Sequence, residues 1–240
     1  MSTKKAASLF ISTIVGAFIM LFTLLYVYDP LSVFHMPFSR DFAFSANNMR
    51  QQNIALLRHF DFDSIIWGNS YVGNTSSKEA AETFGGNFMN LSMSGSTLHE
   101  QSFVLNYALQ TRKIKTVYAI FSESAGKREN PTYPWSNWTF LYDANPLNDF
   151  KVYLNRRYLS CAFMWSDSQE CIGNRAIDHD RPDAWFHLPE NAVLFGGVDT
   201  WIAHSEYNQI NGTLNKTLPT YAEKHIKNLD SEIAQKGYPV

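Results

Sequence analysis

The sequence predicts an α/β fold, a short parallel sheet flanked by helices and preceded by one transmembrane helix. Two features support this prediction. An uncharged apolar run occupies residues 6–28, and three short apolar runs at 63–67, 88–93 and 114–121 alternate with segments of helical character. Strands separated by helices in this order are typical of a parallel sheet with helices on its faces.

The first element is the apolar run Ala6–Tyr28. About 20 apolar helical residues cross a hydrocarbon core, so this run is long enough to span a membrane. A cleaved signal peptide is the alternative, but its apolar part is usually about 7–15 residues long and ends in a small-x-small site, whereas this run ends in YVYDP. Lys4 and Lys5 precede the run, so the positive-inside rule leaves residues 1–5 in the cytoplasm. We therefore expect a single-pass inner (plasma) membrane protein whose domain is periplasmic or extracellular.

Charge limits what the exported part can bind. Without Lys4 and Lys5 it carries 18 basic and 22 acidic residues, a net charge of −4. Nucleic-acid binding requires a basic face for the phosphates. We therefore exclude nucleic acid as a partner.

The exported residues divide into a juxtamembrane segment with a helix at 29–60 and an α/β domain at 61–240, which carries an insertion at about 125–212. The insertion contains both cysteines, Cys161 and Cys171, which are close in sequence. An exported domain lies in a compartment that permits disulfides, so we expect one local bridge that pins a loop. Two buried free thiols are the alternative.

Periodicity and capping boxes in the sequence predict the helices that flank the strands. A first helix is expected at about 47–59, before the first apolar run. The segment SSKE at 76–79 is a capping box that begins a helix through Phe84, and TLHE at 97–100 begins another that continues to about Gln110.

A polar turn follows each predicted strand. These turns are Gly68-Asn69-Ser70, Ser94-Gly95 and Ser122-Glu123-Ser124. In an open parallel sheet, ligands bind beyond the carboxyl ends of the strands, so these turns are the candidate site. A serine placed between a buried strand and a helix is a typical position for a nucleophile, because backbone N–H groups there can meet an oxyanion. The alternative is a turn that merely links strand to helix.

These turns resemble the sequence blocks of the SGNH (GDSL-type) hydrolase family, and in particular its membrane-anchored, extracytoplasmic members associated with acylation of envelope polymers. The resemblance covers about residues 61–124. Gly68-Asn69-Ser70 matches the Gly-Asp-Ser-like first block, which implies that Ser70 is the catalytic nucleophile and that Asn69 belongs to the catalytic turn. The segment 90–95 matches the second block, which implies that Gly95 donates to an oxyanion hole.

Two further family blocks are missing. Ser122-Glu123-Ser124-Ala125 stands where the family has Gly-x-Asn-Asp, and no Asp-x-x-His pair matches the fourth block within the 240 residues. A serine hydroxyl needs a base to accept its proton. His99, His204 and His225 are the candidates for that base. We expect this chain to react slowly or not at all with a serine-directed probe, and a longer natural form that carries Asp-x-x-His to react faster.

Two other segments have simpler interpretations. Residues 178–183 (DHDRPD) hold metal-ligand types without ligand spacing, so a solvated loop is expected, and we predict neither a metal site nor a cofactor. Aromatic residues gather in a second segment, at Tyr133, Trp135, Trp138, Phe140 and Tyr142. We expect them to pack a cap onto the sheet, with stacking on sugar rings as the alternative.

The expected function is therefore that of an acyl esterase or O-acyltransferase, which acts through a serine on an envelope polysaccharide or another cell-surface polymer. The alternative is an inactive SGNH-like accessory module that binds a glycan or a membrane-bound acyltransferase. A histidine within hydrogen-bond reach of Ser70 would distinguish the enzyme from the accessory module.

Overall fold

The computed structural model of the chain describes residues 3–45, 48–122, 125–126, 130–131, 133–173 and 179–182. The elements are, in chain order, α1 (Thr3–Tyr28), α2 (Met49–His59), β1 (Ser64–Trp67), α3 (Ser77–Phe84), β2 (Phe88–Asn90), α4 (Leu98–Thr111), β3 (Thr116–Ala119), the 3-10 helices η2 (Trp135–Asn137), η3 (Thr139–Tyr142) and η4 (Asp149–Val152), α6 (Arg156–Met164) and α7 (Gln169–Ile172). The predicted division into residues 1–5, 6–28, 29–60 and 61–240 stays a prediction, because much of the last part lies outside the described residues.

The three strands form one parallel sheet in the order β2-β1-β3, which confirms the predicted fold class. Ser64 of β1 pairs with Phe88 of β2 on one side and with Thr116 of β3 on the other. Regular pairing in β2 and β3 is shorter than the predicted runs, but parallel bonds continue past the strand ends. Leu91 N–H donates to the Ile66 carbonyl (3.0 Å), and Ile120 N–H donates to the Trp67 carbonyl (3.2 Å).

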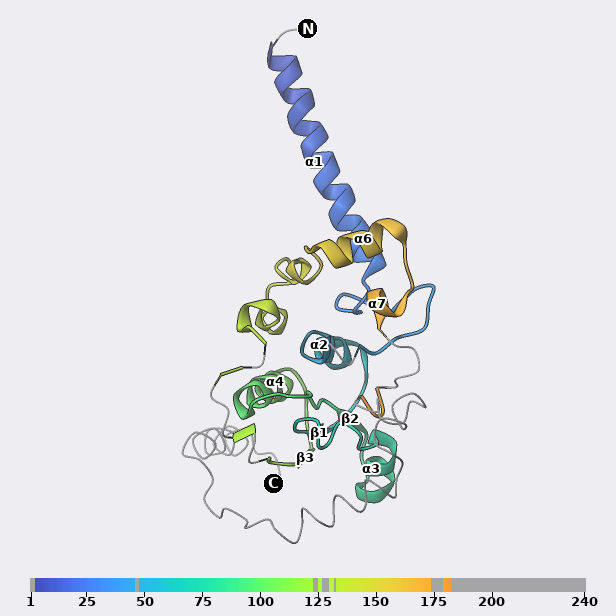
Figure 1. The fold of residues 1–240 in the computed structure, drawn as a ribbon, viewed down its shortest axis with the longest axis vertical. Coiled ribbons are helices and arrows are strands. Elements are labelled where there is room, and N and C mark those ends of the chain that lie inside the picture. Colours follow the sequence, from blue (N-terminus) through green and yellow to red (C-terminus); the bar gives the residue numbers. More distant parts are fainter. Residues whose placement is uncertain are drawn as a thin grey trace, which may run out of the picture.

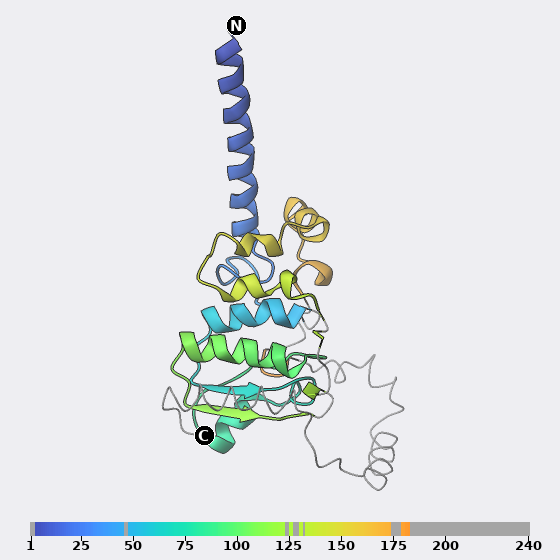
Figure 2. The same cartoon turned by 90° about the vertical axis from the view of Figure 1, so that its left-hand side faces the viewer.

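Helices cover both faces of the sheet (Figures 1 and 2). Ile65 and Trp67 of β1 belong to the larger apolar core, which also contains the buried residues of α2 and α4. Ile66, which points to the opposite face, packs in a smaller cluster with Val72 and Ala80 of the α3 side. This alternation within β1 explains why the strand is entirely apolar after its first residue, since both of its faces are buried.

The capping boxes predicted from the sequence form at the expected positions. Ser76 Oγ accepts from Glu79 N–H at the start of α3, and Thr97 and Glu100 cap α4 reciprocally. These side chains satisfy backbone N–H groups that have no partner within the helix. They fix where α3 and α4 begin, each on the segment that follows a turn of the candidate site.

The apolar helix α1 extends away from the domain (Figure 1). It is long and apolar enough to cross a membrane, and its place near the N-terminus is consistent with a signal anchor or a signal peptide. Its last turn is built into the domain, because Leu25 and Tyr28 are fully buried and the Tyr28 hydroxyl donates to the Ser166 carbonyl.

Asp29 ties the end of α1 to the residues that follow it. Its carboxylate accepts hydrogen bonds from the N–H groups of Val33 (2.9 Å), Phe34 (2.8 Å) and His35 (2.9 Å). It also accepts from the Tyr153 hydroxyl, which lies at the end of η4. One buried side chain therefore joins α1, the juxtamembrane loop and the segment around η4.

A disulfide joins Cys161 of α6 to Cys171 of α7, with their Cα atoms 5.7 Å apart, as predicted. Together with the apolar helix, the bridge points to an extracytoplasmic compartment.

Candidate functional site

The strand order places the candidate site at a topological switch point. β1 is the central strand, and the chain passes from it to β2 on one side and later to β3 on the other. Open parallel sheets bind ligands in the crevice beyond the carboxyl ends of the strands at such a point. The turn that leaves the carboxyl end of β1 is Gly68-Asn69-Ser70.

Gly68 lets the chain turn sharply as β1 ends. Its φ is +155°, and a Cβ there would lie 2.7 Å from Val72 Cγ2 and 3.1 Å from the Ile120 carbonyl oxygen. A side chain at this position would therefore clash with the neighbouring turn. The Gly68 carbonyl accepts from Met93 N–H (3.1 Å), which attaches the first turn to the segment that follows β2.

Asn69 is buried and positions the turn. Its side-chain oxygen accepts from Tyr71 N–H (3.1 Å), and its side-chain nitrogen donates to Ser122 Oγ (2.7 Å). Asn69 therefore links the turn after β1 to the turn after β3. This role is positioning, since its polar atoms are used within the protein.

Ser70 is exposed at the carboxyl edge of the sheet, as predicted. Within the described part of the chain, neither its hydroxyl nor its N–H has a hydrogen-bond partner. Both groups are therefore able to meet a ligand.

The second turn, Ser94-Gly95, follows β2, and Gly95 has a left-handed φ of +66°. A buried ion pair supports this turn from behind: Arg50 Nε of α2 lies 2.6 Å from Glu100 Oε1 of α4. The same guanidinium donates from Nη1 to the Ser94 carbonyl (3.3 Å) and lies over the Tyr133 ring, 4.6 Å from its centroid. In the sequence Glu100 is recognisable only as a capping residue, and no local pattern marks Arg50, because only the fold brings α2 against α4.

The third turn is described at Ser122, whereas Glu123 and Ser124 lie outside the described residues. Ser122 Oγ, which accepts from Asn69, also accepts from Ala125 N–H (3.1 Å). The first and third turns are therefore in direct contact.

His99 is the only one of the three candidate bases within the described residues, since His204 and His225 lie outside them. Its ring packs against Trp135, with the centroids 4.7 Å apart, and no hydrogen bond joins it to Ser70. Partial burial lowers the pKa of His99 below its usual value, so the side chain is neutral at pH 7. The described residues therefore bring Ser70 and Asn69 together with Ser122 but supply no hydrogen-bonded base.

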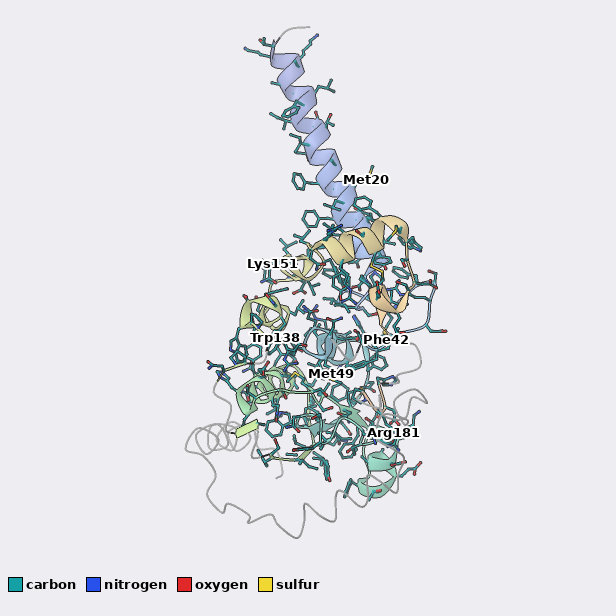
Figure 3. All side chains as sticks on the ribbon, in the orientation of Figure 1. Met20, Phe42, Met49, Trp138, Lys151 and Arg181 are labelled. Carbon is teal, nitrogen blue, oxygen red and sulfur yellow. A yellow bond between two sulfur atoms is a disulfide. The ribbon has the colours of Figure 1, made fainter. Side chains whose placement is uncertain are left out.

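The aromatic segment packs against α4 and α2, and not directly on the sheet as predicted. Trp138 and Tyr142 are buried, and Phe103 of α4 contacts both rings edge-on, at 5.4 Å and 5.8 Å between centroids (Figure 3 labels Trp138). Tyr133 is half exposed above Arg50. Tyr133 is the most exposed ring of the segment, and it borders a hollow of about 220 Å³ together with Asn48, Arg50, Gln51, Asn137 and Trp138.

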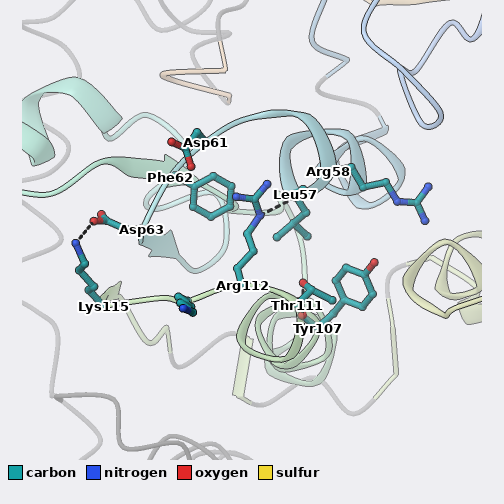
Figure 4. A pocket seen from close by; sticks show the side chains of 10 residues that line it. Leu57, Arg58, Asp61, Phe62, Asp63, Tyr107, Thr111, Arg112 and Lys115 are labelled. Carbon is teal, nitrogen blue, oxygen red and sulfur yellow. Dashed lines mark hydrogen bonds and ion pairs between the residues drawn. The ribbon is translucent and has the colours of Figure 1, made fainter.

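A larger pocket of about 580 Å³ lies at the opposite, amino end of the sheet (Figure 4). Three of its charged groups are engaged within the protein: Lys115 Nζ lies 2.7 Å from Asp63 Oδ2, and the Arg112 guanidinium donates to the carbonyls of Leu57 and Phe60 (2.7 Å each). Because ligands of parallel sheets bind at the carboxyl edge, we assign no function to this pocket.

The prediction of a solvated loop at 178–183 is wrong for the described residues, 179–182, because this part is bound to the domain. The Asp180 carboxylate accepts from Ser76 Oγ (2.9 Å) and from Lys78 N–H (2.8 Å), and Arg181 Nη1 donates to the Asn74 carbonyl (2.7 Å). The segment is therefore fixed to the start of α3, where a carboxylate complements the exposed N–H groups of the first turn. Among the described residues no group of histidine, cysteine or carboxylate side chains could hold a metal ion.

Comparison with protein-family models, with curated proteins and with solved structures finds no match to this chain.

Proposed function

We propose that this chain is a membrane-anchored, SGNH-like acyl esterase or O-acyltransferase that acts on an envelope polysaccharide or another cell-surface polymer. Ser70 is the proposed nucleophile, and the N–H groups of Ser70 and Gly95 are the proposed oxyanion donors. The observation that carries the proposal is the exposed Ser70, with its hydroxyl and N–H unengaged by any described residue, at the switch point of a parallel sheet.

The surroundings of Ser70 support an acyl-transfer site. The turn is held by Asn69 on the Ser122 side and by the Gly68 carbonyl on the β2 side, so its position is fixed before a substrate binds. A fixed N–H donor stabilises the oxyanion of a tetrahedral intermediate because no reorganisation is needed during the reaction. In the reaction, Ser70 Oγ would attack the ester carbonyl, the alcohol would leave, and a second hydroxyl or water would take the acyl group from Ser70.

The membrane anchor is the second part of the proposal. A signal peptidase that cut at the end of the apolar run would remove Leu25 and Tyr28, which are fully buried in the domain. The same cut would separate Asp29 from α1, although the Asp29 side chain ties the end of α1 to the domain. These contacts favour a retained anchor over a cleaved signal peptide, with the domain on the periplasmic or extracellular side.

One observation favours an accessory binding module as the second candidate function. Ser70 has no hydrogen-bonded base among the described residues, and the ring of His99 packs on Trp135. Without general-base assistance a serine hydroxyl loses about 10²–10⁴-fold in rate. Such a module would bind a glycan or a membrane-bound acyltransferase at the same edge of the sheet.

A fluorophosphonate probe distinguishes the two functions. The full chain is incubated with the probe, and the modified residue is located by mass spectrometry. We expect slow labelling at Ser70, lost in Ser70→Ala and retained in the matched control Ser136→Ala, because Ser136 is an exposed serine that does not follow a β-strand. No labelling, together with an unchanged envelope phenotype in Ser70→Ala, would contradict the enzyme and leave the accessory module.

A further inference from the structure

Four large apolar side chains are exposed around the foot of α1. They are Phe38 in the juxtamembrane loop, Phe163 and Met164 at the end of α6, and Trp165, with 73%, 71%, 69% and 51% of their surfaces exposed. We call these four residues the collar. Large apolar patches on a protein surface mark an interaction site.

The outward face of α6 carries part of the collar. Tyr158, Cys161 and Ala162 are buried against the domain, and the disulfide of Cys161 holds this face in place. On a surface helix the opposite face is normally polar. Here that face ends in Phe163 and Met164, and its first turn carries the exposed Arg156 and Arg157. The exposed face of α6 therefore combines basic and large apolar side chains, which are the two kinds of side chain that interfacial helices use to bind membranes.

Trp165 is held in an unfavourable backbone conformation. It caps α6 with φ +50° and ψ +42°, a left-handed conformation that glycine adopts more readily than other residues. Its ring packs against Tyr28 in the last turn of α1, with the centroids 5.6 Å apart.

Phe38 is attached to the same turn of α1 from another segment. Its ring stacks on His35 with the centroids 4.2 Å apart, and His35 Nε2 is hydrogen-bonded to the Tyr26 carbonyl (2.7 Å). Two separate parts of the domain therefore bring aromatic rings to the end of the apolar helix.

The length of α1 fixes the depth of these rings. At about 1.5 Å per residue, residues 6–28 extend about 35 Å, slightly more than the roughly 30 Å of a hydrocarbon core. Tyr26 and Tyr28 then lie at the boundary between hydrocarbon and headgroups, where tryptophan and tyrosine are enriched in membrane proteins. Trp165 packs on Tyr28 of this turn, and Phe38 is joined to it through His35, so both rings lie near the same depth.

We propose that the collar inserts into the headgroup region of the outer leaflet and holds the domain at a fixed orientation on the membrane. The occupant is the lipid bilayer itself, because the collar is continuous with the helix that crosses it. Arg156 then contacts lipid phosphates while the collar contacts acyl chains, whereas Arg157 Nε donates to the Glu170 carbonyl (2.6 Å) within the protein. Since the strands run across the direction of α1 (Figure 2), the carboxyl edge that carries Ser70 would open along the membrane surface at a constant height.

This inference rests on the proposed membrane span, so the experiment tests the two separately. Full-length protein is reconstituted in vesicles of equal parts phosphatidylcholine and phosphatidylglycerol, with a nitroxide at one cysteine substitution. The positions are Phe163→Cys in the collar, Phe18→Cys in α1, and Phe84→Cys on α3 as the matched control. Phe84 is an exposed phenylalanine of α3, the helix that Figure 1 shows at the end of the domain away from α1. Mass spectrometry verifies that the native disulfide is intact in each variant.

Electron paramagnetic resonance compares collisions of each label with oxygen, which concentrates in hydrocarbon, and with a water-soluble nickel chelate. We expect the oxygen-to-nickel ratio at position 163 to lie below that at position 18, which is near the middle of the span, and clearly above that at position 84. Equal ratios at 163 and 84, with a high ratio at 18, overturn the collar and leave the anchor standing. A low ratio at all three positions overturns the anchor.

A protein partner is the remaining occupant of the collar. In that case the label at 163 would be shielded from both reagents in native membranes and exposed to nickel in the pure lipid vesicles. This result would also overturn the proposal.

Discussion

The buried ion pair between Arg50 and Glu100 provides a quantitative test of the fold at the candidate site. The side chains are 7% and 0% exposed, and Arg50 Nε lies 2.6 Å from Glu100 Oε1. Replacing Arg50 with methionine leaves the Glu100 carboxylate buried without its cation. Loss of one partner of a buried pair costs about 3–5 kcal/mol of unfolding free energy.

Glu100→Gln is expected to cost less, about 2–3 kcal/mol, for two reasons. Glutamine preserves the capping box with Thr97, since either residue suits that position. Arg50 retains its bond to the Ser94 carbonyl and its place over Tyr133. The double variant removes both charges, so its cost should fall below the sum of the single costs by about 1–3 kcal/mol.

Urea unfolding of the full chain in detergent micelles measures these costs through tryptophan fluorescence, because Trp67 and Trp138 are buried in the same core. Arg156→Met, an exposed arginine on α6, is the matched control and should change the unfolding free energy by less than about 0.5 kcal/mol. A cost below about 1 kcal/mol for Arg50→Met, or additive single costs, would refute the reasoning, because it would show that the pair is solvated.

Two further predictions concern the disulfide and the amino end of the sheet. Non-reducing mass spectrometry should recover Cys161 joined to Cys171. Replacing both cysteines with serine should lower the unfolding free energy by about 2–3 kcal/mol, as expected for a short closed loop. Alkylation of both thiols without prior reduction would contradict the bridge. The Asn87 N–H, and then Lys115, lower the pKa of Asp63 from 3.8 to about 2. The stabilisation by Asp63 is therefore complete above pH 3.8 and is lost as the pH falls through 2. Asp63→Asn should cost about 1 kcal/mol at pH 6, after allowance for solvent screening, and much less near pH 2. Urea unfolding of Asp63→Asn at pH 6 and near pH 2 checks the direction of this pH dependence. An equal cost at the two pH values would show that the charge of the Asp63 carboxylate does not stabilise the fold.

Several features follow from the sequence because they depend on neighbours along the chain. The apolar run at 6–28 predicts α1 through its length, and the capping boxes at 76–79 and 97–100 predict where α3 and α4 begin through hydrogen bonds that span three residues. The buried strand β1 follows from an apolar run that has no polar face. The disulfide also follows from the sequence, since its two cysteines are close together in an exported segment.

Other features depend on contacts between distant segments, which local periodicity does not encode. The order β2-β1-β3 places Ser70 at the switch point, although the chain order of the strands fits other arrangements equally well. The Arg50–Glu100 pair joins residues 50 positions apart, and Asp180 docks on α3 from more than 100 positions away.

The clearest contrast is between Ser70 and His99. The sequence by itself determined that Ser70 would follow a buried strand, because strand, turn and helix are consecutive. Only the tertiary structure decided that the His99 ring packs against Trp135 rather than bonding to Ser70, because the direction of an exposed side chain on a helix depends on which segment packs beside it.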